Sequence, residues 1–402
     1  MLDFLTDDVR RDPWPLYAQM RAASPLFRVP PNGPWMIFDH AGVRRALDDH
    51  ENFSSGASPS GATDHPLPWM IFYDPPRHTK LRALVSRAFT PRSIAALEPR
   101  IAAISGDLLD AAVERATRDG RGEFDLVADY AAPLPMMVIA EMLGIPSSER
   151  EKFKRWSDTL LGLSETISGD AQAGARAGVN YLDVTEEMEA YLIDVLSTFR
   201  SAPKDNLLHG LALAEVDGQR LTHQEILGFF QLLLLAGSET TINLIGNCVI
   251  CLLDHPDQLA RLRERTDLVP SAIEEVLRFR SPLQAVFRAT RRDVEMHGQV
   301  IPAGKLVLPI IGSANRDAAV FAEPDRFDIA RDPNPHVAFG HGIHFCLGAA
   351  LARLEAKVAL PDLLGRLKNL ERASAESWSP RGAFHVHGPA RLALRIEHAS
   401  RG

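Results

Sequence analysis

The 402-residue chain has little of several features that mark particular classes of protein. It has only three cysteines, too few for the disulfide framework of a small secreted domain. Lys and Arg number 44 against 52 Asp and Glu, a net charge of -8, and no basic stripe is present, which argues against nucleic acid as a partner. The N-terminus is acidic and has no long apolar run, so we expect no signal peptide, no membrane anchor and a cytoplasmic protein.

The sequence also lacks linkers and repeats. Although 402 residues exceed the usual size of one domain, the chain shows no composition shift that would divide it. Apolar residues make up 46% of the chain, enough to fill a substantial core. We therefore expect one domain over residues 1–402, whose partners are small molecules and other proteins.

Two of the cysteines form a C-x-x-C pair, Cys248 and Cys251. They lie in an apolar helical run, and no second pair is near them in the sequence. Zinc and redox sites need further ligands or a suitable loop. We therefore interpret both as buried structural thiols.

The third cysteine lies in the stretch 339–348, Phe-Gly-His-Gly-Ile-His-Phe-Cys-Leu-Gly, just before a helix-forming run at 349–360. At the start of a helix, unpaired backbone N–H groups and the helix dipole stabilise the thiolate that a metal needs as a ligand. The three glycines suit a turn that approaches a large flat group closely. Cys346 is therefore a candidate metal ligand within a bulky cofactor site, although a lone thiol is more often simply buried.

A capping box, Thr222-x-x-Glu225, predicts the start of the longest helix, from about His223 to Leu253. Much of this helix is apolar, but several polar residues within it argue against a membrane span. A helix of this length can cross the whole domain.

A polar cluster, residues 236–241 (Ala-Gly-Ser-Glu-Thr-Thr), lies in the middle of that helix. Burying Glu or Thr without a partner costs about 1–3 kcal/mol each. The Thr240 hydroxyl can bond to the carbonyl of Ala236 and, next to Gly237, the helix can open into a groove. An ion-paired Glu239 with a structural role is the simpler alternative.

Two charged pairs are spaced for contact on helices. His78 and Arg82, four residues apart after Asp-Pro-Pro, could bind two carboxylates, or could belong to a solvated basic face. Glu275 and Arg278, three apart, could form an ion pair of the kind found on many solvated helices. Neither spacing decides its role alone.

Other segments are less regular. We expect strands at 35–38, 283–288, 300–302 and 306–308, and a last hairpin formed by 384–388 and 392–394. Helical stretches at 147–161 and 181–199 are separated by a small-residue joint at 162–178 that suits a mobile lid or a plain connection. The segment 54–68, rich in Ser, Gly and Pro, predicts a long loop.

Together the His-x-x-x-Arg helix, the polar cluster, Glu-x-x-Arg and the cysteine loop resemble the cytochrome P-450 family in content and order. The resemblance spans nearly the whole chain. It implies a mainly α fold, a triangular helical prism with a small β-sheet region. It also implies haem b, with Cys346 as the iron ligand, lying between the long helix and the helix after the cysteine.

The resemblance implies further site residues. Cofactor binding falls to His78, Arg82, Ala236, Gly237, Arg288, Phe339, His344, Cys346 and Gly348. Glu239 and Thr240 would be the acid and the alcohol that deliver protons during oxygen activation. Glu275 and Arg278 would form a structural network with Arg326, for which Arg331 is the rival.

The implied activity is that of a monooxygenase inserting one atom of O2 into a lipophilic small molecule. A peroxide-driven peroxygenase or a non-catalytic haem sensor is the alternative, and the Glu239–Thr240 pair favours the monooxygenase. We expect a monomer that receives electrons from ferredoxin and ferredoxin reductase. Lys80, Arg87 and Arg353 would face the acidic ferredoxin.

The resemblance also places substrate against the segments 54–72 and 160–181 and against Leu232, Leu235, Ala236, Leu283, Gln284, Val286 and Phe384. An apolar lining rewards buried hydrocarbon and penalises an unpaired charge. We therefore expect a neutral terpenoid, steroid or macrolide, with fatty acids second. Small polar compounds held by Gln284 and His65 are the remaining alternative.

Overall fold

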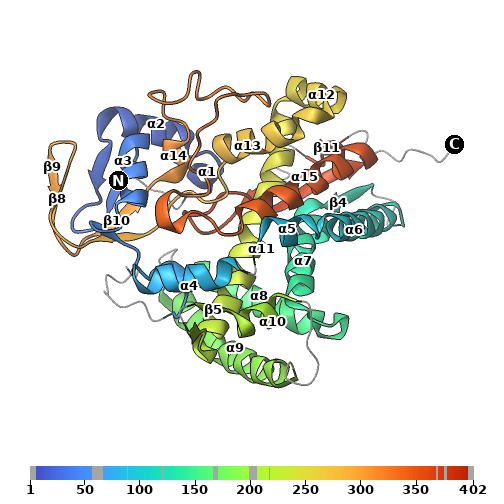
Figure 1. The fold of residues 1–402 in the computed structure, drawn as a ribbon. Helices are drawn as coiled ribbons and strands as arrows, with labels where there is room; N and C mark the ends of the chain where they lie inside the picture. The colour runs from blue at the N-terminus through green and yellow to red at the C-terminus, as the bar shows by residue number, and fades with distance from the viewer. Residues whose placement is uncertain are drawn as a thin grey trace.

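The computed structural model is a mainly helical protein with small sheets, which confirms the predicted fold class (Figure 1). It describes residues 6–56, 67–87, 89–118, 122–165, 171–198, 206–216, 218–367, 370–374 and 378–396. The α-helices are α1 Asp7–Arg11, α2 Trp14–Ala23, α3 His40–Asp48, α4 Arg77–Ser86, α5 Pro91–Ala95, α6 Glu98–Arg118, α7 Pro133–Leu143, α8 Arg150–Glu165, α9 Ala171–Thr198, α10 Leu207–Leu213, α11 His223–Asp254, α12 Pro256–Glu264, α13 Val269–Phe279, α14 Ile311–Ala314 and α15 Ala349–Arg366.

Short strands lie mainly in two sheets. The five-stranded sheet has the order β1-β2-β10-β7-β3, in which only β10 and β2 are parallel. The C-terminal strand β13 pairs with β11, β12 and β4. The strands are β1 Leu26–Arg28, β2 Trp35–Ile37, β3 Phe53–Ser54, β4 Glu123–Asp125, β5 Glu215–Val216, β6 Gln219–Arg220, β7 Arg288–Thr290, β8 Val294–Met296, β9 Gln299–Ile301, β10 Leu306–Pro309, β11 Leu370–Arg372, β12 Trp378–Pro380 and β13 Pro389–Ile396.

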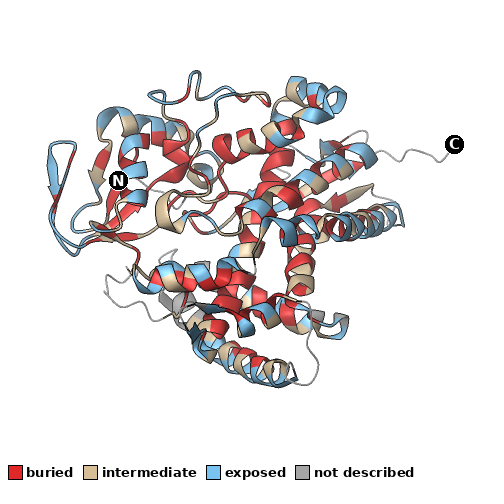
Figure 2. Ribbon diagram, in the orientation of Figure 1, coloured by how far each residue is buried: buried red, intermediate tan, exposed pale blue. Residues whose placement is uncertain are grey.

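The long helix α11 runs through the middle of the molecule, and most of its length is buried (Figures 1 and 2). The predicted capping box is present: the Glu225 N–H donates to Thr222 Oγ1 (3.2 Å), and the Thr222 N–H donates to Glu225 Oε2 (2.9 Å). By length and apolarity α11 could cross a membrane, but 72% of its most apolar window is buried against the rest of the protein. That burial is typical of a core helix.

Helix α11 joins two apolar cores. Its first half, residues 226–234, packs with α4, α8, α9 and α10. Its second half, residues 242–252, packs with α6, α13 and α15. Between these two stretches lies the polar cluster, where Ala236 is exposed although α11 is otherwise largely buried. The interruption of the core places an accessible stretch of α11 in the centre of the fold.

Several predicted boundaries were wrong. The joint expected at 162–178 is shorter, because α8 continues to Glu165 and α9 begins at Ala171. Most of 283–288 is not strand, since only isolated bridges of Leu283 and Ala285 precede β7. The last hairpin is also different, because β13 pairs with β12 rather than with 384–388. In the last two cases strand pairing outweighs local propensity.

Candidate active site

The cysteine loop, residues 339–348, ends at the N-terminus of α15. The Cys346 N–H donates to the first carbonyl of the loop (2.9 Å). Gly340 and Gly342 have φ angles of +74° and +68°, in the left-handed region that favours glycine. A Cβ on Gly342 would stand 3.0 Å from the Cα of Asp48, so this glycine also lets α3 approach. The turn therefore requires both glycines to present Cys346 at the start of α15.

The environment of Cys346 suits a coordinating sulfur. Burial raises the pKa of its thiol, whereas the N–H groups of Gly348 and Ala349 and the charges of Arg82 and Arg353 lower it. The side chain is nevertheless accessible, so the sulfur faces a space that protein largely surrounds. A metal ion deprotonates a coordinating thiol outright, and these N–H groups and cations stabilise the resulting thiolate.

The glycine after the cysteine leaves room beside the backbone. Within the described residues, no atom other than those of Gly348 and its two chain neighbours lies within 4 Å of the place where a Cβ on Gly348 would stand. The ring of Phe339 lies on the other side of the loop, 4.5 Å from the guanidinium carbon of Arg353. The loop therefore has free space beside Gly348, and its Phe339 ring already packs on the Arg353 guanidinium.

A second cluster joins cation-forming side chains from α4, β7 and the cysteine loop. The rings of His78 and His344 have centroids 4.1 Å apart. Both ring nitrogens of His78 and Nε2 of His344 are buried without a hydrogen-bond partner. Burial is the main cause that lowers the pKa of His78 to about 4, of His344 to about 3 and of Arg288 to about 10.

These groups are close enough to influence one another, since Arg288 and Arg82 both lower the pKa of His344. Arg82 donates to the carbonyl of Phe345 (2.8 Å), which ties α4 to the cysteine loop. Buried donors without acceptors are costly, and charged donors bind carboxylates strongly. The cluster fits the two carboxylates of a haem beside Cys346.

The middle of α11 is a continuous α-helix. The Thr240 hydroxyl donates to the carbonyl of Ala236 (2.8 Å), as the sequence predicts. Glu239 is buried, at 8% exposure, and Thr240 is half-buried. The expected local opening at Gly237 is wrong: a Cβ there would stand 2.6 Å from Ile139 Cδ1, so this glycine allows close packing with α7.

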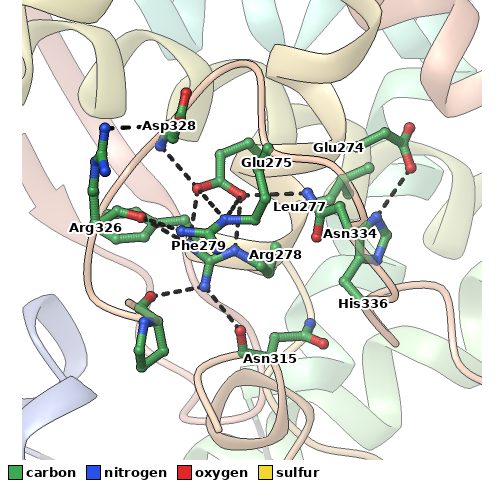
Figure 3. A network of polar contacts seen from close by, with 12 residues as sticks. Glu274, Glu275, Leu277, Arg278, Phe279, Asn315, Arg326, Asp328, Asn334 and His336 are labelled. Atoms are coloured by element: carbon green, nitrogen blue, oxygen red, sulfur yellow. Dashed lines mark hydrogen bonds and ion pairs between the residues drawn. The ribbon is translucent and has the colours of Figure 1, made fainter. Parts of the chain in front are cut away.

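The Glu-x-x-Arg pair of α13 is completely buried (Figure 3). Arg278 donates from Nε and Nη2 to the two carboxylate oxygens of Glu275, at 2.7 and 2.8 Å. Three backbone carbonyls accept its remaining donors, and the carboxylate accepts further N–H groups. These partners are Asn315 O, Pro324 O and Arg326 O for the guanidinium, and Asp328 N and Asn334 Nδ2 for the carboxylate.

The third side chain of this network is that of Arg331, and the assignment to Arg326 was wrong. Arg331 Nε lies 3.2 and 3.1 Å from the two oxygens of Glu275. The side chain of Arg326 is 58% exposed and pairs with Glu323, 3.1 Å away. Only the Arg326 carbonyl belongs to the network, because its side chain points to the surface.

A neighbouring cluster that the sequence did not predict is built on Glu274. Its carboxylate accepts from Arg353 at 2.7 and 2.8 Å and pairs with His336 Nε2 at 3.0 Å. Burial opposes its ionisation, but these hydrogen bonds lower the pKa of Glu274 to about 2. The cluster ties α13 and α15 to the segment before the cysteine loop. Its adjacency to Glu275 was the only sequence signal.

The predicted substrate-lining residues separate into two groups. Leu235, Leu283, Val286 and Phe384 are half-buried and Leu232 is buried at 6% exposure, all against apolar cores. Gln284 does not line a space: it is 1% exposed, donates to the Ser281 carbonyl (2.6 Å) and packs on Gly312. The predicted polar contact His65 lies outside the described residues.

The remaining cysteines are buried in α11, at 2% and 1% exposure. Burial raises the pKa of Cys248 and raises that of Cys251 to about 12. Within the described ranges no group of three or more His, Cys, Asp and Glu could hold a metal ion. Cys346 is the only metal ligand that was proposed from the sequence.

The helical fold, the loop cysteine and the buried cation-forming cluster together define a haem-thiolate enzyme. Residues 26–374 match the family model "Cytochrome P450". The chain is 43% identical over 373 residues to a vitamin D(3) 25-hydroxylase of Pseudonocardia autotrophica, covering 90% of this chain and 88% of that protein.

Solved structures agree with this match. Cytochrome P450 CYP109Q5 from Chondromyces apiculatus superposes with a TM-score of 0.88 at 42% identity, covering 99% of this chain and 98% of that chain. CYP109E1 from Bacillus megaterium in complex with testosterone gives a TM-score of 0.86 at 37% identity, covering 96% and 100%. The chain belongs to the cytochrome P450 family. It is a haem-containing monooxygenase whose iron is bound by the thiolate of Cys346.

Proposed function

We propose that the enzyme inserts one oxygen atom of O2 into a neutral lipophilic molecule of terpenoid, steroid or macrolide type, with electrons from a cytoplasmic ferredoxin and its reductase. The observation that carries the substrate class is the accessible stretch of α11. Ala236 is exposed there, beside the half-buried Leu235. Apolar surface of this kind gains about 25 cal/mol for each Å² of hydrocarbon it covers.

Two cations of α8 that could bind a carboxylate substrate are already paired with acids. Lys154 pairs with Asp158 at 2.8 Å, and Arg155 pairs with Glu187. Both cations are more than half exposed on α8. The names of two relatives, a vitamin D(3) hydroxylase and a testosterone complex, support a neutral polycyclic substrate.

When bound, the haem supplies the oxidising chemistry, with two electrons and two protons consumed and the second oxygen atom released as water. Cys346 would hold it from the α15 side. His78, Arg82, Arg288 and His344 would bind its carboxylates, which would give partners to the buried ring nitrogens of His78 and His344. These five residues would hold the haem, and substrate would approach it from the side of Ala236.

Glu239 and Thr240 would deliver the protons. The Thr240 hydroxyl can release its bond to Ala236 and turn toward the oxygen site, and Glu239 can supply the proton from its buried position. In Thr240→Ala we expect reductant consumption to continue with about tenfold less product and a matching rise in hydrogen peroxide. Thr241→Ala, at the buried neighbouring position, is the control. Unchanged coupling between reductant and product would contradict this role.

Substrate class can be tested on the ferric holoenzyme. The haem Soret band is titrated with lipid pairs that differ only in carrying a neutral group or a carboxylate, including a steroid pair and a fatty-acid pair. We expect the neutral member to bind at least tenfold more tightly, because an unpaired buried charge is costly. Consistently tighter binding of the acids would favour a fatty-acid substrate instead.

The electron donor is proposed to dock near α4. Within the described residues no ion pair involves Lys80 or Arg87, whereas Arg353 is paired with Glu274. Charge reversal of Lys80 and Arg87 should slow reduction by ferredoxin several-fold at low salt and much less at high salt. Reduction rates that are unaffected by charge reversal and by salt, or full turnover with peroxide alone, would contradict this part of the proposal.

A further inference from the structure

A buried amide on α11 connects two segments that are far apart in sequence. The side chain of Gln231 is 0% exposed. Its Oε1 accepts from Trp69 Nε1 and from the Tyr181 hydroxyl, both at 3.1 Å. Its Nε2 donates to Thr185 Oγ1 at 3.0 Å. One amide therefore joins α11 to the segment 67–73 and, through two residues, to α9.

The same segment contacts α11 one turn earlier. A Cβ on Gly228 would stand 2.2 Å from the carbonyl oxygen of Pro68. Only glycine allows that approach, since real Cβ atoms do not come so close to backbone. The segment is thus fixed to α11 at two successive turns, by close packing at Gly228 and by a hydrogen bond at Gln231.

These contacts lie one turn from the accessible stretch of α11. Gly228, Gln231 and Leu235 follow one another at spacings of three and four residues, so they share a face of α11. Leu235 is partly buried against the same apolar core as Leu347, which adjoins Cys346, and Ala236 beside Leu235 is exposed. Gln231 therefore lies one turn before the stretch of α11 at which substrate is proposed to bind.

We propose that Gln231 is a positioning residue that latches the segment 67–73 and α9 onto α11, and so controls how often the active site opens to large ligands. Opening by either element leaves part of the buried amide without partners. Such unpaired groups are avoided in protein interiors. Gln231 Oε1 accepts from both elements, through Trp69 and Tyr181. Movement of one element therefore weakens the hydrogen bond that holds the other.

A latch has a kinetic signature. A large ligand must pass through the open state both to enter and to leave, so a weaker latch raises both rates by one factor and leaves Kd unchanged. The probe is clotrimazole, a bulky imidazole, whose binding to the ferric holoenzyme is followed by the Soret band in stopped flow. For Gln231→Leu we expect both rates to rise about tenfold, more than the loss of any one of its three hydrogen bonds should give.

A matched control lies on the same pair of helices. Gln224 is exposed and donates to Glu189 of α9 at 3.0 Å. Gln224→Leu removes a similar amide contact between α11 and α9 at the surface, so both rates should stay within twofold of wild type. Equal effects of the two variants would overturn the assignment to the buried amide.

Milder variants test the latch without loss of Gln231. Tyr181→Phe and Trp69→Phe each remove one donor, and each should raise both rates about threefold. Gly228→Ala should act in the same direction by displacing Pro68, and alanine favours the helix itself. In the Gln231→Leu background Tyr181→Phe should add less than twofold. Rates within twofold of wild type in all single variants, or a changed Kd with an unchanged association rate, would refute the latch.

Discussion

Two buried polar clusters differ in how their hydrogen bonds are completed: one supports the segment before the cysteine loop, and the other includes His344 of that loop. In the first cluster, Glu275, Arg278 and Arg331 bond to one another and to backbone groups, and none of their buried atoms lacks a partner. In the second, His78 and His344 contact each other and have buried nitrogens without partners. Both clusters combine charge with burial.

The difference separates structural from binding roles. A network whose donors and acceptors match internally can stabilise the fold by itself. A cluster of cation-forming groups without acceptors costs free energy until an anion arrives. Charge and burial alone do not distinguish the two roles, whereas the count of completed hydrogen bonds does. Removing a residue from each cluster should therefore have different consequences for the apoprotein.

The largest effect is expected for Arg278→Leu. This change leaves the carboxylate of Glu275 buried without its bidentate partner, which costs about 3–5 kcal/mol. Urea unfolding of the apoprotein, followed by circular dichroism, measures the loss of unfolding free energy. We also expect poor haem incorporation, since the network supports the segment before the cysteine loop. A loss below 1 kcal/mol would show that the network is dispensable.

The next prediction separates the two candidate third arginines. Arg331→Ala removes a side chain that is bonded to Glu275 and should cost about 2–3 kcal/mol of unfolding free energy. Arg326→Ala removes an exposed side chain paired only at the surface and should cost below about 0.5 kcal/mol. The same urea experiment compares them directly. Equal losses would mean that the side-chain contact of Arg331 contributes little.

The cluster of His78, Arg82, Arg288 and His344 should behave in the opposite way to the Glu275 network. Arg288→Leu removes a buried cation, so the apoprotein should keep its stability to within about 0.5 kcal/mol. The holoenzyme should lose haem about tenfold faster, measured by transfer to apomyoglobin, because one carboxylate loses its donor. Arg291→Leu, an exposed neighbour paired with Asp74, is the control. If Arg288→Leu destabilised the apoprotein as much as Arg278→Leu does, the comparison would fail.

Local motifs predicted the parts of the site that are contiguous in sequence. The capping box placed the start of α11, the cysteine loop placed Cys346 before α15, and the spacing of Thr240 predicted its bond to Ala236. The capping box and the Thr240 bond join residues within four positions of one another, and the cysteine loop spans ten residues. Local rules describe such contacts well.

Features that depend on tertiary packing were missed or wrong. Arg326 and Arg331 lie in an irregular segment without periodicity, so nothing local shows which side chain turns inward. In the sequence, Glu274 cannot be distinguished from an acid on a solvated helix. Its role depends on contacts with Arg353 and His336, which are distant in the chain. The role of Gly237 depends on Ile139 of α7. In each case the deciding contact comes from a distant part of the chain.

A third arrangement, a buried carboxyl with one oxygen that has no hydrogen-bond partner among the described residues, provides the smallest expected effect. Glu355 of α15 is 1% exposed, and its Oε2 has no hydrogen-bond partner. Burial raises the pKa of Glu355 to about 8, above its unfolded value of about 4.3. At pH values between these two, the unfolded state ionises and the native state stays neutral.

The contribution of Glu355 to stability therefore falls as the pH rises from about 4 to about 8. Glu355→Gln removes this titration, so it should stabilise the apoprotein at pH 8 relative to pH 5, by on the order of 1 kcal/mol after local relaxation. Urea unfolding at the two pH values measures the difference, and Glu371→Gln on an exposed strand position serves as control. A variant whose stability follows the wild-type pH dependence would show that Glu355 finds a partner in solution. Glu355 would then resemble Glu275, whose burial is compensated by hydrogen bonds within the protein.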